Sequence, residues 1–371
     1  MKFLISKGSI FKSLSHLQGV VDKKNSLPIL SNILLEANSN KLTLSSTDMD
    51  ISMIEHIDCD IVEEGSTTIN SQIFYDVIRK LADDSEVEVI SNDGKRLTIR
   101  SNKSKFSLAC LPKEDFPIIE KIEQGNKVNI NSKILHSLID KTKFAISNEE
   151  TRYFLNGLYF NITNKEGNNL ITLVGTDGHR LATNSSKLDS PFQEIPGVII
   201  PRKTINELSK ILSETDNEIE IDITQNKINF YFEKITLSSK LIDGSFPDYQ
   251  RVIPKNNNNY LNINRVSLLS AVDRVSTVAN EKSPVIKIKL FENIVNLSTV
   301  NSDNSTATED IKCEYNGDEI EIGFNSKYIM DIINNLESEN ILLKFKDNSS
   351  PIIVEEKSNP NLIFVLMPMR V

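Results

Sequence analysis

Apolar residues recur along the chain with two periods, and the same succession of periods appears three times. Each third opens with a short strand-like segment that runs into an amphipathic helix, in which apolar positions return every three or four residues. In the first of these helices, Ile10, Leu14, Leu17 and Val21 form one apolar stripe. The three predicted strand–helix segments cover residues 5–24, 128–146 and 261–281.

A second helix is predicted in the later half of each third, where an apolar strand end is followed by a polar helix cap. These starts are Ile69-Asn70-Ser71, Ile200-Pro201-Arg202 and Phe324-Asn325-Ser326. Aligned on them, the copies lie 131 and 124 residues apart, and acidic residues and leucines fall in matching columns. The columns are Asp76, Glu207 and Asp331, and Leu81, Leu212 and Leu336. The period exceeds the roughly 20–50 residues of a solenoid unit, so the repeat is domain-sized.

Between the helices, apolar and polar residues alternate with a period of two, as in antiparallel strands with one buried face. The predicted strands cover residues 86–90, 97–100, 106–110, 218–223, 227–232, 235–239, 341–345, 352–355 and 362–367. Antiparallel sheets covered by two helices make each third an α+β domain. Proline-containing stretches before each new copy set the predicted domains at 1–125, 126–254 and 255–371.

The net charge of −9 at first argues against a nucleic-acid partner, but the charge is unevenly distributed. The six helix segments, taken as 6–24, 69–82, 131–146, 200–212, 263–281 and 324–337, together carry +7, so the rest of the chain carries −16. A phosphate backbone responds to the local field rather than to the total charge. The separation therefore keeps nucleic acid among the possible partners.

The chain has the features of a cytoplasmic protein. Its apolar runs fall short of the roughly 20 residues that cross a bilayer, and the N-terminus lacks the pattern of a signal peptide. Cys59, Cys110 and Cys313, one in each third, have no metal-ligand spacing and predict reduced, buried or half-buried thiols.

Catalytic motifs are missing from the sequence, which has no phosphate-binding loop, dinucleotide-binding glycine motif, zinc-protease motif or nucleophile elbow. We therefore expect no catalytic residue, no metal and no cofactor. Asp48 and Asp50 could form a metal site. However, Ser46-Thr47-Asp48 recurs as Gly175-Thr176-Asp177, and a repeated turn capped by aspartate explains this better.

Two further segments are rich in functional residue types. Residues 175–181, with His179 and Arg180, predict either a simple hairpin turn or part of a site. The C-terminus, 365–371, is apolar almost to its last residue, with Met367 and Met369 around a proline. These methionines fit an adaptable partner-binding surface and a core-filling edge strand equally well.

Several short motifs, in order along the whole chain, resemble the bacterial replicative sliding clamp, the β subunit of DNA polymerase III. The motifs are 26–30 (SLPIL), 152–157 (RYFLNG), 176–181 (TDGHRL), 201–203 (PRK), 243–249 (DGSFPDY) with Arg251-Val252, and 367–370 (MPMR). The resemblance implies three domains of one fold, each with two helices and two small sheets. It also implies a head-to-tail homodimer that closes into a ring around double-stranded DNA without reading its sequence. The function implied is processivity without catalysis.

Residues that match the family's DNA contacts are Lys24, Arg152, Tyr153, Phe154, Arg202 and Lys203. Two departures concern this set. Phe154 lacks the hydroxyl of the more common tyrosine, and Asn148-Glu149-Glu150 places acids where the family has polar residues. We expect Lys24 and Lys203 to contribute more than the 148–154 loop.

The resemblance also implies an apolar groove between the middle and last domains that binds short apolar peptide motifs. Its expected users are the replicative polymerase α subunit, the clamp-loader δ subunit, and repair and other proteins with a clamp-binding motif. The matching residues are Leu155, Thr176, Gly178, His179, Arg180, Leu181, Pro247, Arg251, Val252, Val365, Met367, Pro368, Met369 and Arg370, with Asn325 and Tyr328 at the edge.

The first domain of one subunit is expected to join the last domain of the other. Basic residues of the first domain would meet acidic residues of the last. These charges could instead protect solvated edge strands, but their opposite signs at the two ends of the chain favour self-association. The residues concerned are Arg96, Arg100, Lys103 and Lys105, with Asp303, Glu309 and Asp310, and the apolar contacts Thr277 and Val278.

Two alternatives stay open at this level. One is an enzyme of unknown class that uses the Asp48 or His179 region. The other is a peptide-binding scaffold in which DNA plays no part.

Overall fold

A computed structural model describes residues 1–21, 27–119, 125–165, 168–188, 195–280 and 284–370 of the 371. Lys24 and Val371 lie outside the described residues. The fold divides into two compact units, one mainly of residues 1–136 and 203–241, the other mainly of residues 137–189, 194–202 and 242–371.

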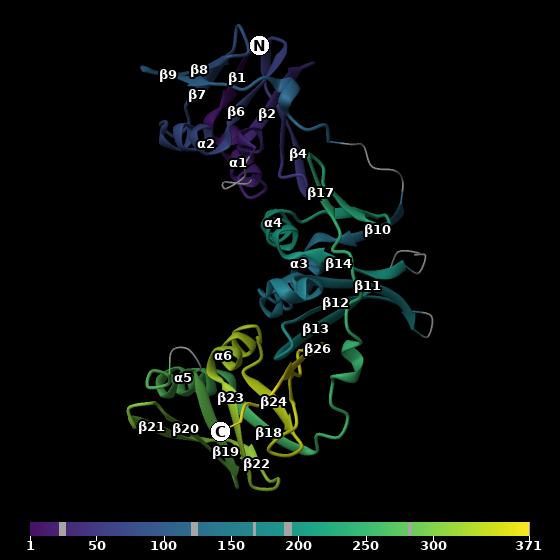
Figure 1. Cartoon of the computed structure of the whole chain (residues 1–371), viewed down its shortest axis with the longest axis vertical. Coiled ribbons are helices and arrows are strands. Elements are labelled where there is room, and N and C mark those ends of the chain that lie inside the picture. The colour runs from purple at the N-terminus through teal and green to yellow at the C-terminus, as the bar shows by residue number, and fades with distance from the viewer. Residues whose placement is uncertain (22–26, 120–124, 166–167, 189–194, 281–283, 371) are drawn as a thin grey trace. The chain divides into compact units, whose positions relative to one another are not determined.

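All six predicted α-helices are present, and each begins at or close to its predicted cap (Figure 1). They are α1 (Lys7–Leu17), α2 (Ser71–Lys80), α3 (Ser132–Asp140), α4 (Arg202–Ser213), α5 (Arg265–Ser276) and α6 (Ser326–Asn334). Side-chain oxygens of Ser6, Asn70, Asn264 and Asn325 accept hydrogen bonds from backbone N–H groups in the first turns of α1, α2, α5 and α6.

Three of the helices are shorter than the sequence pattern predicts. The pattern extends α1 to residue 24, α3 to residue 146 and α5 to residue 281, whereas the helices end at Leu17, Asp140 and Ser276. After α1 the backbone tightens, and the N–H of Val20 donates to the carbonyl of Leu17, three residues before it. After α3, the Thr142 hydroxyl donates to the carbonyl of Leu138, and a 3-10 turn, η3 (Lys143–Ala145), takes over. Val20 and Ala145 remain buried, so the apolar pattern persists although the helix does not.

In the first unit, a five-stranded antiparallel sheet has the order β5-β1-β7-β8-β9. Its strands are β1 (Lys2–Ser6), β5 (Asp60–Glu63), β7 (Glu86–Ile90), β8 (Arg96–Ser101) and β9 (Ser104–Ala109). An eight-stranded sheet has the order β10-β15-β16-β17-β4-β3-β2-β6. Its strands are β2 (Asn32–Asn38), β3 (Lys41–Thr47), β4 (Ile51–Asp58), β6 (Gly65–Asn70), β10 (Asn126–Asn131), β15 (Glu218–Ile223), β16 (Lys227–Tyr231) and β17 (Ile235–Lys240).

In the second unit, a nine-stranded sheet has the order β14-β11-β12-β13-β26-β25-β24-β18-β22. Its strands are β11 (Gly157–Lys165), β12 (Asn168–Thr176), β13 (Arg180–Leu188), β14 (Ile195–Pro201), β18 (Asn259–Asn264), β22 (Glu314–Tyr315), β24 (Asn340–Phe345), β25 (Ile352–Glu356) and β26 (Asn359–Leu366). A four-stranded sheet has the order β21-β20-β19-β23. Its strands are β19 (Val285–Phe291), β20 (Ile294–Val300), β21 (Thr306–Lys312) and β23 (Ile320–Asn325).

Each third of the chain contributes strands to two sheets, but the sheets do not stop at the predicted domain boundaries. Strand β4 of the first third pairs with β17 of the second, and β13 of the second third pairs with β26 of the last. Both pairings are antiparallel, and β13 and β26 occupy the places in the nine-stranded sheet that β4 and β17 occupy in the eight-stranded sheet. Equivalent edges of the repeated domain are therefore joined in the same way at both boundaries.

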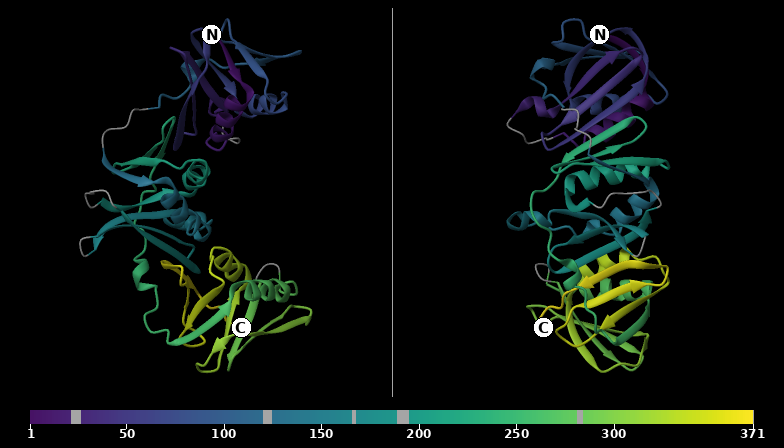
Figure 2. Two further views of the ribbon diagram at one scale, coloured as in Figure 1. Left: turned by 180° about the vertical axis from the view of Figure 1, so that it is seen from behind. Right: turned by 90° about the vertical axis from the view of Figure 1, so that its right-hand side faces the viewer.

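The helices cover the sheets with their apolar faces. In the first unit α1 packs on β1, β3 and β4, and α2 packs on α1 and β6. In the second unit α5 and α6 lie side by side over β18–β21 and β23, respectively (Figure 2). Phe324, Phe345 and Phe364 are fully buried in the core beneath them.

Candidate functional site

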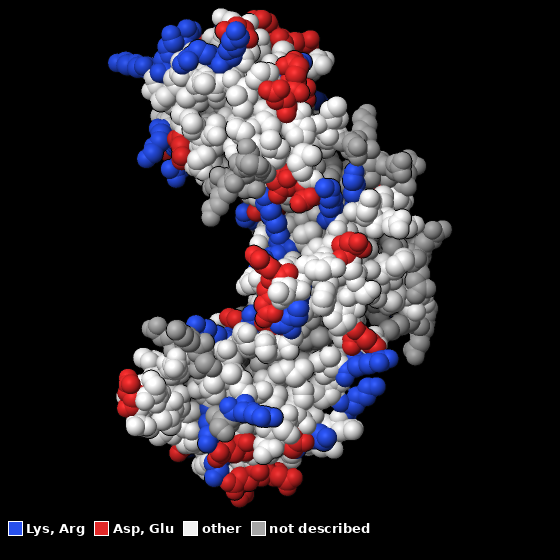
Figure 3. Space-filling model, in the orientation of Figure 1, with Lys and Arg blue, Asp and Glu red and all other residues white. Residues whose placement is uncertain are grey.

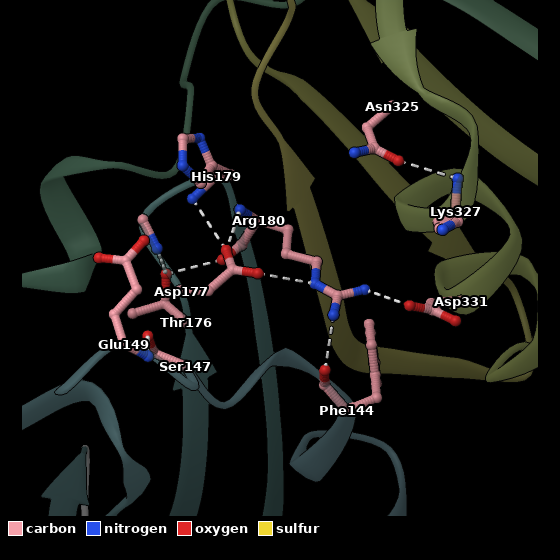
Figure 4. Close-up of polar contacts among 11 residues, drawn as sticks. Phe144, Ser147, Glu149, Thr176, Asp177, His179, Arg180, Asn325, Lys327 and Asp331 are labelled. Carbon is pink, nitrogen blue, oxygen red and sulfur yellow. Dashed lines mark hydrogen bonds and ion pairs between the residues drawn. The ribbon is translucent and has the colours of Figure 1, made fainter. Parts of the chain in front are cut away.

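A tight turn between β12 and β13 organises the polar residues predicted for the groove (Figure 4). The Thr176 hydroxyl donates to the carbonyl of Arg180 and accepts from the N–H of Gly178. Asp177 Oδ1 accepts from the N–H groups of His179 and Arg180, each at 2.9 Å. Gly178 has a φ of +87°, a conformation that favours glycine.

The same turn recurs between β3 and β4, as the repeat in the sequence predicts. Thr47 and Asp48 make the equivalent hydrogen bonds, and Met49 takes the place of the glycine with a φ of +81°. Asp48 is therefore occupied with backbone N–H groups as a turn-forming residue. Among the described residues, no group of three or more His, Cys, Asp and Glu is arranged to hold a metal ion.

An apolar cavity of about 280 Å³ lies beside the Thr176 turn, within the second unit. Its wall combines the turn, the loop before β18, the segment 152–155 and the end of β26. The lining residues are Arg152, Phe154, Leu155, Thr176, Gly178, Arg180, Leu181, Pro247, Tyr249, Val252, Val365 and Met367.

The cavity brings together nine of the sixteen residues predicted for the groove. Leu181 and Val365 are buried together with Val174 in a small cluster against which Tyr249 packs. Tyr249 is a lining residue that the sequence analysis missed, although it lies in the quoted 243–249 motif. The other seven predicted residues are not part of the cavity lining: His179, Arg251, Asn325, Tyr328, Pro368, Met369 and Arg370.

Some of these seven residues lie close to the cavity and help to fix the chain around it. The ring of His179 is 6.4 Å from the ring of Tyr328, centroid to centroid. The carbonyl of His179 accepts a hydrogen bond from the N–H of Met367, and the N–H of Met369 donates to the carbonyl of Gly323. The backbone of the C-terminal segment is therefore fixed to the rest of the second unit at Met367 and Met369.

Arg180 lines the cavity, but three acceptors hold its guanidinium. Nη1 lies 2.5 Å from Asp331 Oδ2, Nη2 donates to the carbonyl of Phe144 at 2.8 Å, and Nε lies 3.1 Å from Asp177 Oδ2 (Figure 4). The guanidinium carbon also lies 4.4 Å from the ring centroid of Tyr328. The side chain is only 10% exposed.

The segment 149–155 carries residues predicted for two different surfaces. Within η4 (Glu150–Leu155), Tyr153 is 54% exposed, whereas Phe154 and Leu155 line the cavity. Glu149 Oε2 holds the Arg152 guanidinium at 2.8 Å. The acid that departs from the family's pattern therefore neutralises a predicted DNA contact in this chain.

The other predicted DNA contacts differ in their surroundings. Arg202 is exposed at the start of α4. Lys203 is half-buried, with Nζ 2.5 Å from Asp48 Oδ2 and 2.7 Å from the carbonyl of Val20. Lys203 thus links α4 to the turn that contains Asp48 in the same unit.

The charged residues predicted for self-association lie on two hairpins, β8–β9 and β20–β21, each of which includes the edge strand of a sheet. Strand β9 is the edge of the five-stranded sheet, and β21 is the edge of the four-stranded sheet. Lys and Arg gather over the β8–β9 hairpin, and acidic side chains lie at the end of the β20–β21 hairpin (Figure 3). Some of these charges already have partners in the chain, since Arg274 forms a two-point ion pair with Glu309 and Asn296 donates to Asp310. Thr277 is exposed and Val278 half-buried just after α5.

A buried polar cluster in the first unit has no counterpart in the sequence predictions. His16 on α1 lies 3.0 Å from Glu55 Oε2 and 3.4 Å from Glu214 Oε2, and Ser13 donates to Glu55 Oε1 at 2.6 Å. Burial lowers the pKa of His16, whereas the hydrogen bond and the charge of Glu55, with a smaller contribution from Glu214, raise it. The two glutamates together outweigh burial, so the pKa of His16 is raised from 6.5.

The three cysteines are half-buried free thiols, as predicted. Burial raises the pKa of Cys59 and that of Cys313 to about 11, so neither is an activated thiolate. Within the described part of the chain, the longest helix has 12 residues, and none has the length and apolar character needed to cross a membrane.

Three repeats of one α+β fold, with an apolar cavity beside a capped turn, define a repeated-domain protein that acts by binding. Comparisons with known proteins identify the family. Models of the N-terminal, central and C-terminal domains of the DNA polymerase III beta subunit match residues 1–120, 129–248 and 250–370, respectively.

Full-length relatives and solved structures agree with these matches. The chain is 38% identical to a beta sliding clamp of Caulobacter vibrioides and 34% identical to that of Escherichia coli K12, with 100% of each chain covered. A crystal structure of a Bartonella birtlesii sliding clamp bound to griselimycin matches with a TM-score of 0.96 at 38% identity, again over both complete chains. A Pseudomonas aeruginosa clamp bound to griselimycin matches with a TM-score of 0.94 at 33% identity.

The chain therefore belongs to the DNA polymerase III beta subunit family, the beta sliding clamps, which are non-catalytic processivity factors of DNA polymerase III. The predicted family and α+β fold are confirmed. The alternative of an enzyme that uses the Asp48 or His179 region is wrong.

Proposed function

We propose that two copies of this chain close head to tail into a ring that encircles double-stranded DNA in the cytoplasm. Edge strands β9 and β21 support this, because among the described residues each pairs with a strand on one side only, and the hairpins that contain them carry opposite charge. A contact between β9 of one subunit and β21 of another joins two different surfaces and is therefore heterologous. Such contacts form a closed ring when the rotation that relates neighbouring subunits returns to the first subunit. Retention by topology requires only weak, sequence-independent contacts to phosphates.

The proposed DNA contacts are those of the family pattern: Lys24, Arg152, Tyr153, Phe154, Arg202 and Lys203. Their surroundings support a ranking that differs from the one expected from sequence. Arg202 is exposed, whereas Lys203 would have to give up Asp48 and Arg152 would have to give up Glu149. We therefore propose Arg202 as the main phosphate contact among the described members of the set.

The single observation that carries the partner-binding function is the apolar cavity at the Thr176 turn. Its volume of about 280 Å³ suits one or two apolar side chains rather than a whole folded domain. Backbone around the cavity is pinned by hydrogen bonds, so the cavity is largely formed before a ligand arrives. We propose that short apolar segments of the polymerase, the clamp loader and other replication or repair proteins enter it in turn.

Retention on closed circular DNA tests the ring. The protein is loaded onto nicked circular DNA by a clamp loader, and the DNA is then isolated by gel filtration before and after linearisation. A sliding ring stays on the circle and is lost from the linear form. A peptide-binding scaffold without a DNA role would not be retained on either, and an ordinary DNA binder would remain on both.

A charge reversal tests the proposed interface between subunits. Lys105→Glu on the exposed edge strand β9 should shift the protein from dimer to monomer in light scattering at micromolar concentration, because it places acid against acid. Lys113→Glu, exposed on η2 (Lys113–Asp115) away from that edge, is the matched control and should remain dimeric. A wild-type monomer at moderate salt would refute the proposed dimer.

Griselimycin provides a direct probe of ligand binding, because two relatives of known structure are bound to it. We propose that this chain also binds griselimycin, at the apolar cavity. Isothermal titration calorimetry with the wild-type protein measures the affinity, and no detectable binding at micromolar concentrations would count against the proposed site.

A further inference from the structure

Asp331 lies on α6, outside the cavity lining, yet it forms an ion pair with Arg180, a residue of that lining (Figure 4). Arg180 is a wall residue whose guanidinium is held by Asp331, Asp177 and the carbonyl of Phe144. We propose that Asp331 is a positioning residue that acts through Arg180 to keep the apolar cavity shaped for its ligand. This inference rests on the proposed peptide-binding function.

The arrangement of donors and acceptors favours a positioning role over direct ligand recognition. A guanidinium has five N–H donors, and three of its nitrogens already face protein acceptors. With the side chain only 10% exposed, the two N–H donors that remain are largely covered by the protein, so a bound ligand has little direct access to the guanidinium. Arg180 therefore contributes to the cavity mainly as a fixed part of its wall.

Aromatic rings restrict the guanidinium further. It lies over Tyr328 of α6 at 4.4 Å and over Phe144 at 5.1 Å, measured from the guanidinium carbon to each ring centroid. The same α6 therefore supplies both the carboxylate and one ring face. Because the turn, Arg180 and α6 are fixed together, the wall residue has little rotamer freedom left to lose when a ligand binds.

The other copy of the turn provides independent support for this role. There Asp48, in the first third of the chain, pairs with Lys203 of α4, the second helix of the second third. In the same way, the Thr176 turn lies in the second third, and α6 is the second helix of the last third. The polarity is reversed, because a cation on the helix holds the turn in one copy and an anion does so in the other. An ion pair from the next second helix to the Thr-Asp turn is thus a repeated feature of this chain.

The test compares two variants that each remove one carboxylate charge from an ion pair near the end of α6. Asp331→Asn removes the charge that pairs with Arg180, and Glu337→Gln removes the charge that pairs with Lys141; neither Lys141 nor Glu337 is in the cavity lining. Griselimycin affinity is measured by isothermal titration calorimetry, and thermal unfolding is measured on the same samples. We expect Asp331→Asn to weaken binding about three- to tenfold, as when one immobilised side chain is released, and Glu337→Gln to leave it unchanged.

A second background separates positioning from general loss of stability. The variant Arg180→Lys lacks the planar guanidinium that contacts several acceptors at once. Adding Asp331→Asn to it should weaken binding by less than twofold further, because the arginine through which Asp331 acts is already gone. Wild-type affinity in Asp331→Asn, or equal losses in Asp331→Asn and Glu337→Gln, would overturn the positioning role. Absence of binding to the wild-type protein would instead overturn the proposed peptide groove, and the inference with it.

Discussion

The two methionines near the C-terminus separate the roles of backbone and side chain in the cavity. The sequence pattern treats Met367 and Met369 as equals, but only Met367 lines the cavity. The N–H of each residue is tied to a carbonyl, that of Met367 to His179 and that of Met369 to Gly323. Met367→Ala and Met369→Ala keep both backbone bonds and differ in the apolar surface that they remove from the cavity.

The size of the expected effect follows from the groups removed. Methionine to alanine deletes roughly three heavy atoms, each worth about 0.8 kcal/mol when fully buried by a ligand. Met367 is already half-buried in the free protein, so about half of that burial remains for a ligand to complete. The expected loss is about 1–2 kcal/mol of binding free energy for Met367→Ala, or roughly 5- to 30-fold in affinity. For Met369→Ala we expect less than about twofold.

Two assays measure this difference. Calorimetry with griselimycin reports affinity at the cavity, and polymerase stimulation on primed circular DNA reports the proposed function. Deleting residues 367–371 should cost more than Met367→Ala, because it also removes the hydrogen bonds to His179 and Gly323. Light scattering must show an unchanged oligomer in each case. If Met369→Ala weakened binding as much as Met367→Ala, the cavity could not be the site of contact.

Two further predictions concern stability. The pKa of His16 is raised because the effect of its glutamate partners exceeds that of burial. Its contribution to the free energy of unfolding is therefore complete below the pKa of the unfolded chain, near 6.5, and is lost as the pH rises through the pKa of the folded protein. The thermal midpoint of the wild-type protein should fall over that range more steeply than that of His16→Gln, and parallel pH profiles would contradict the assignment. At Gly178, with a φ of +87°, alanine should cost about 1–2 kcal/mol of unfolding free energy for the left-handed backbone, and its Cβ would also overlap the Arg152 guanidinium. Gly94→Ala, with a φ of +69° and open space around the position, should cost the backbone part alone, and an equal loss in both by chemical denaturation would show that the Arg152 contact adds nothing.

Local patterns predicted the elements well. All six helices and all nine quoted strands are present, and β7 and β15 match their predicted bounds. Between β7 and β8, the Asn92-Asp93-Gly94 turn is held by Asp93 Oδ1, which accepts from the N–H of Lys95. These features depend on neighbours within a few residues, which is why period, caps and turn residues identify them.

The helix ends were predicted less well, because the apolar pattern does not specify where the backbone stops being helical. Val20, Val21 and Ala145 are buried as a continued helix would require, but the backbone passes into tighter turns after Leu17 and Asp140. An apolar stripe records which side chains are buried. It does not record the backbone conformation that carries them.

The sequence by itself determined the three-fold repeat, the capped helices, the period-two strands and the paired Thr-Asp turns, because each is encoded by residues close together in the chain. Only the tertiary structure decided that sheets run on across the repeat boundaries, that Lys203 is held by Asp48, and that Arg180 binds Asp331. Those ion pairs join residues 155 and 151 positions apart. Whether a charge faces solvent, DNA or a buried partner depends on which distant segment packs against it, and no local pattern carries that information.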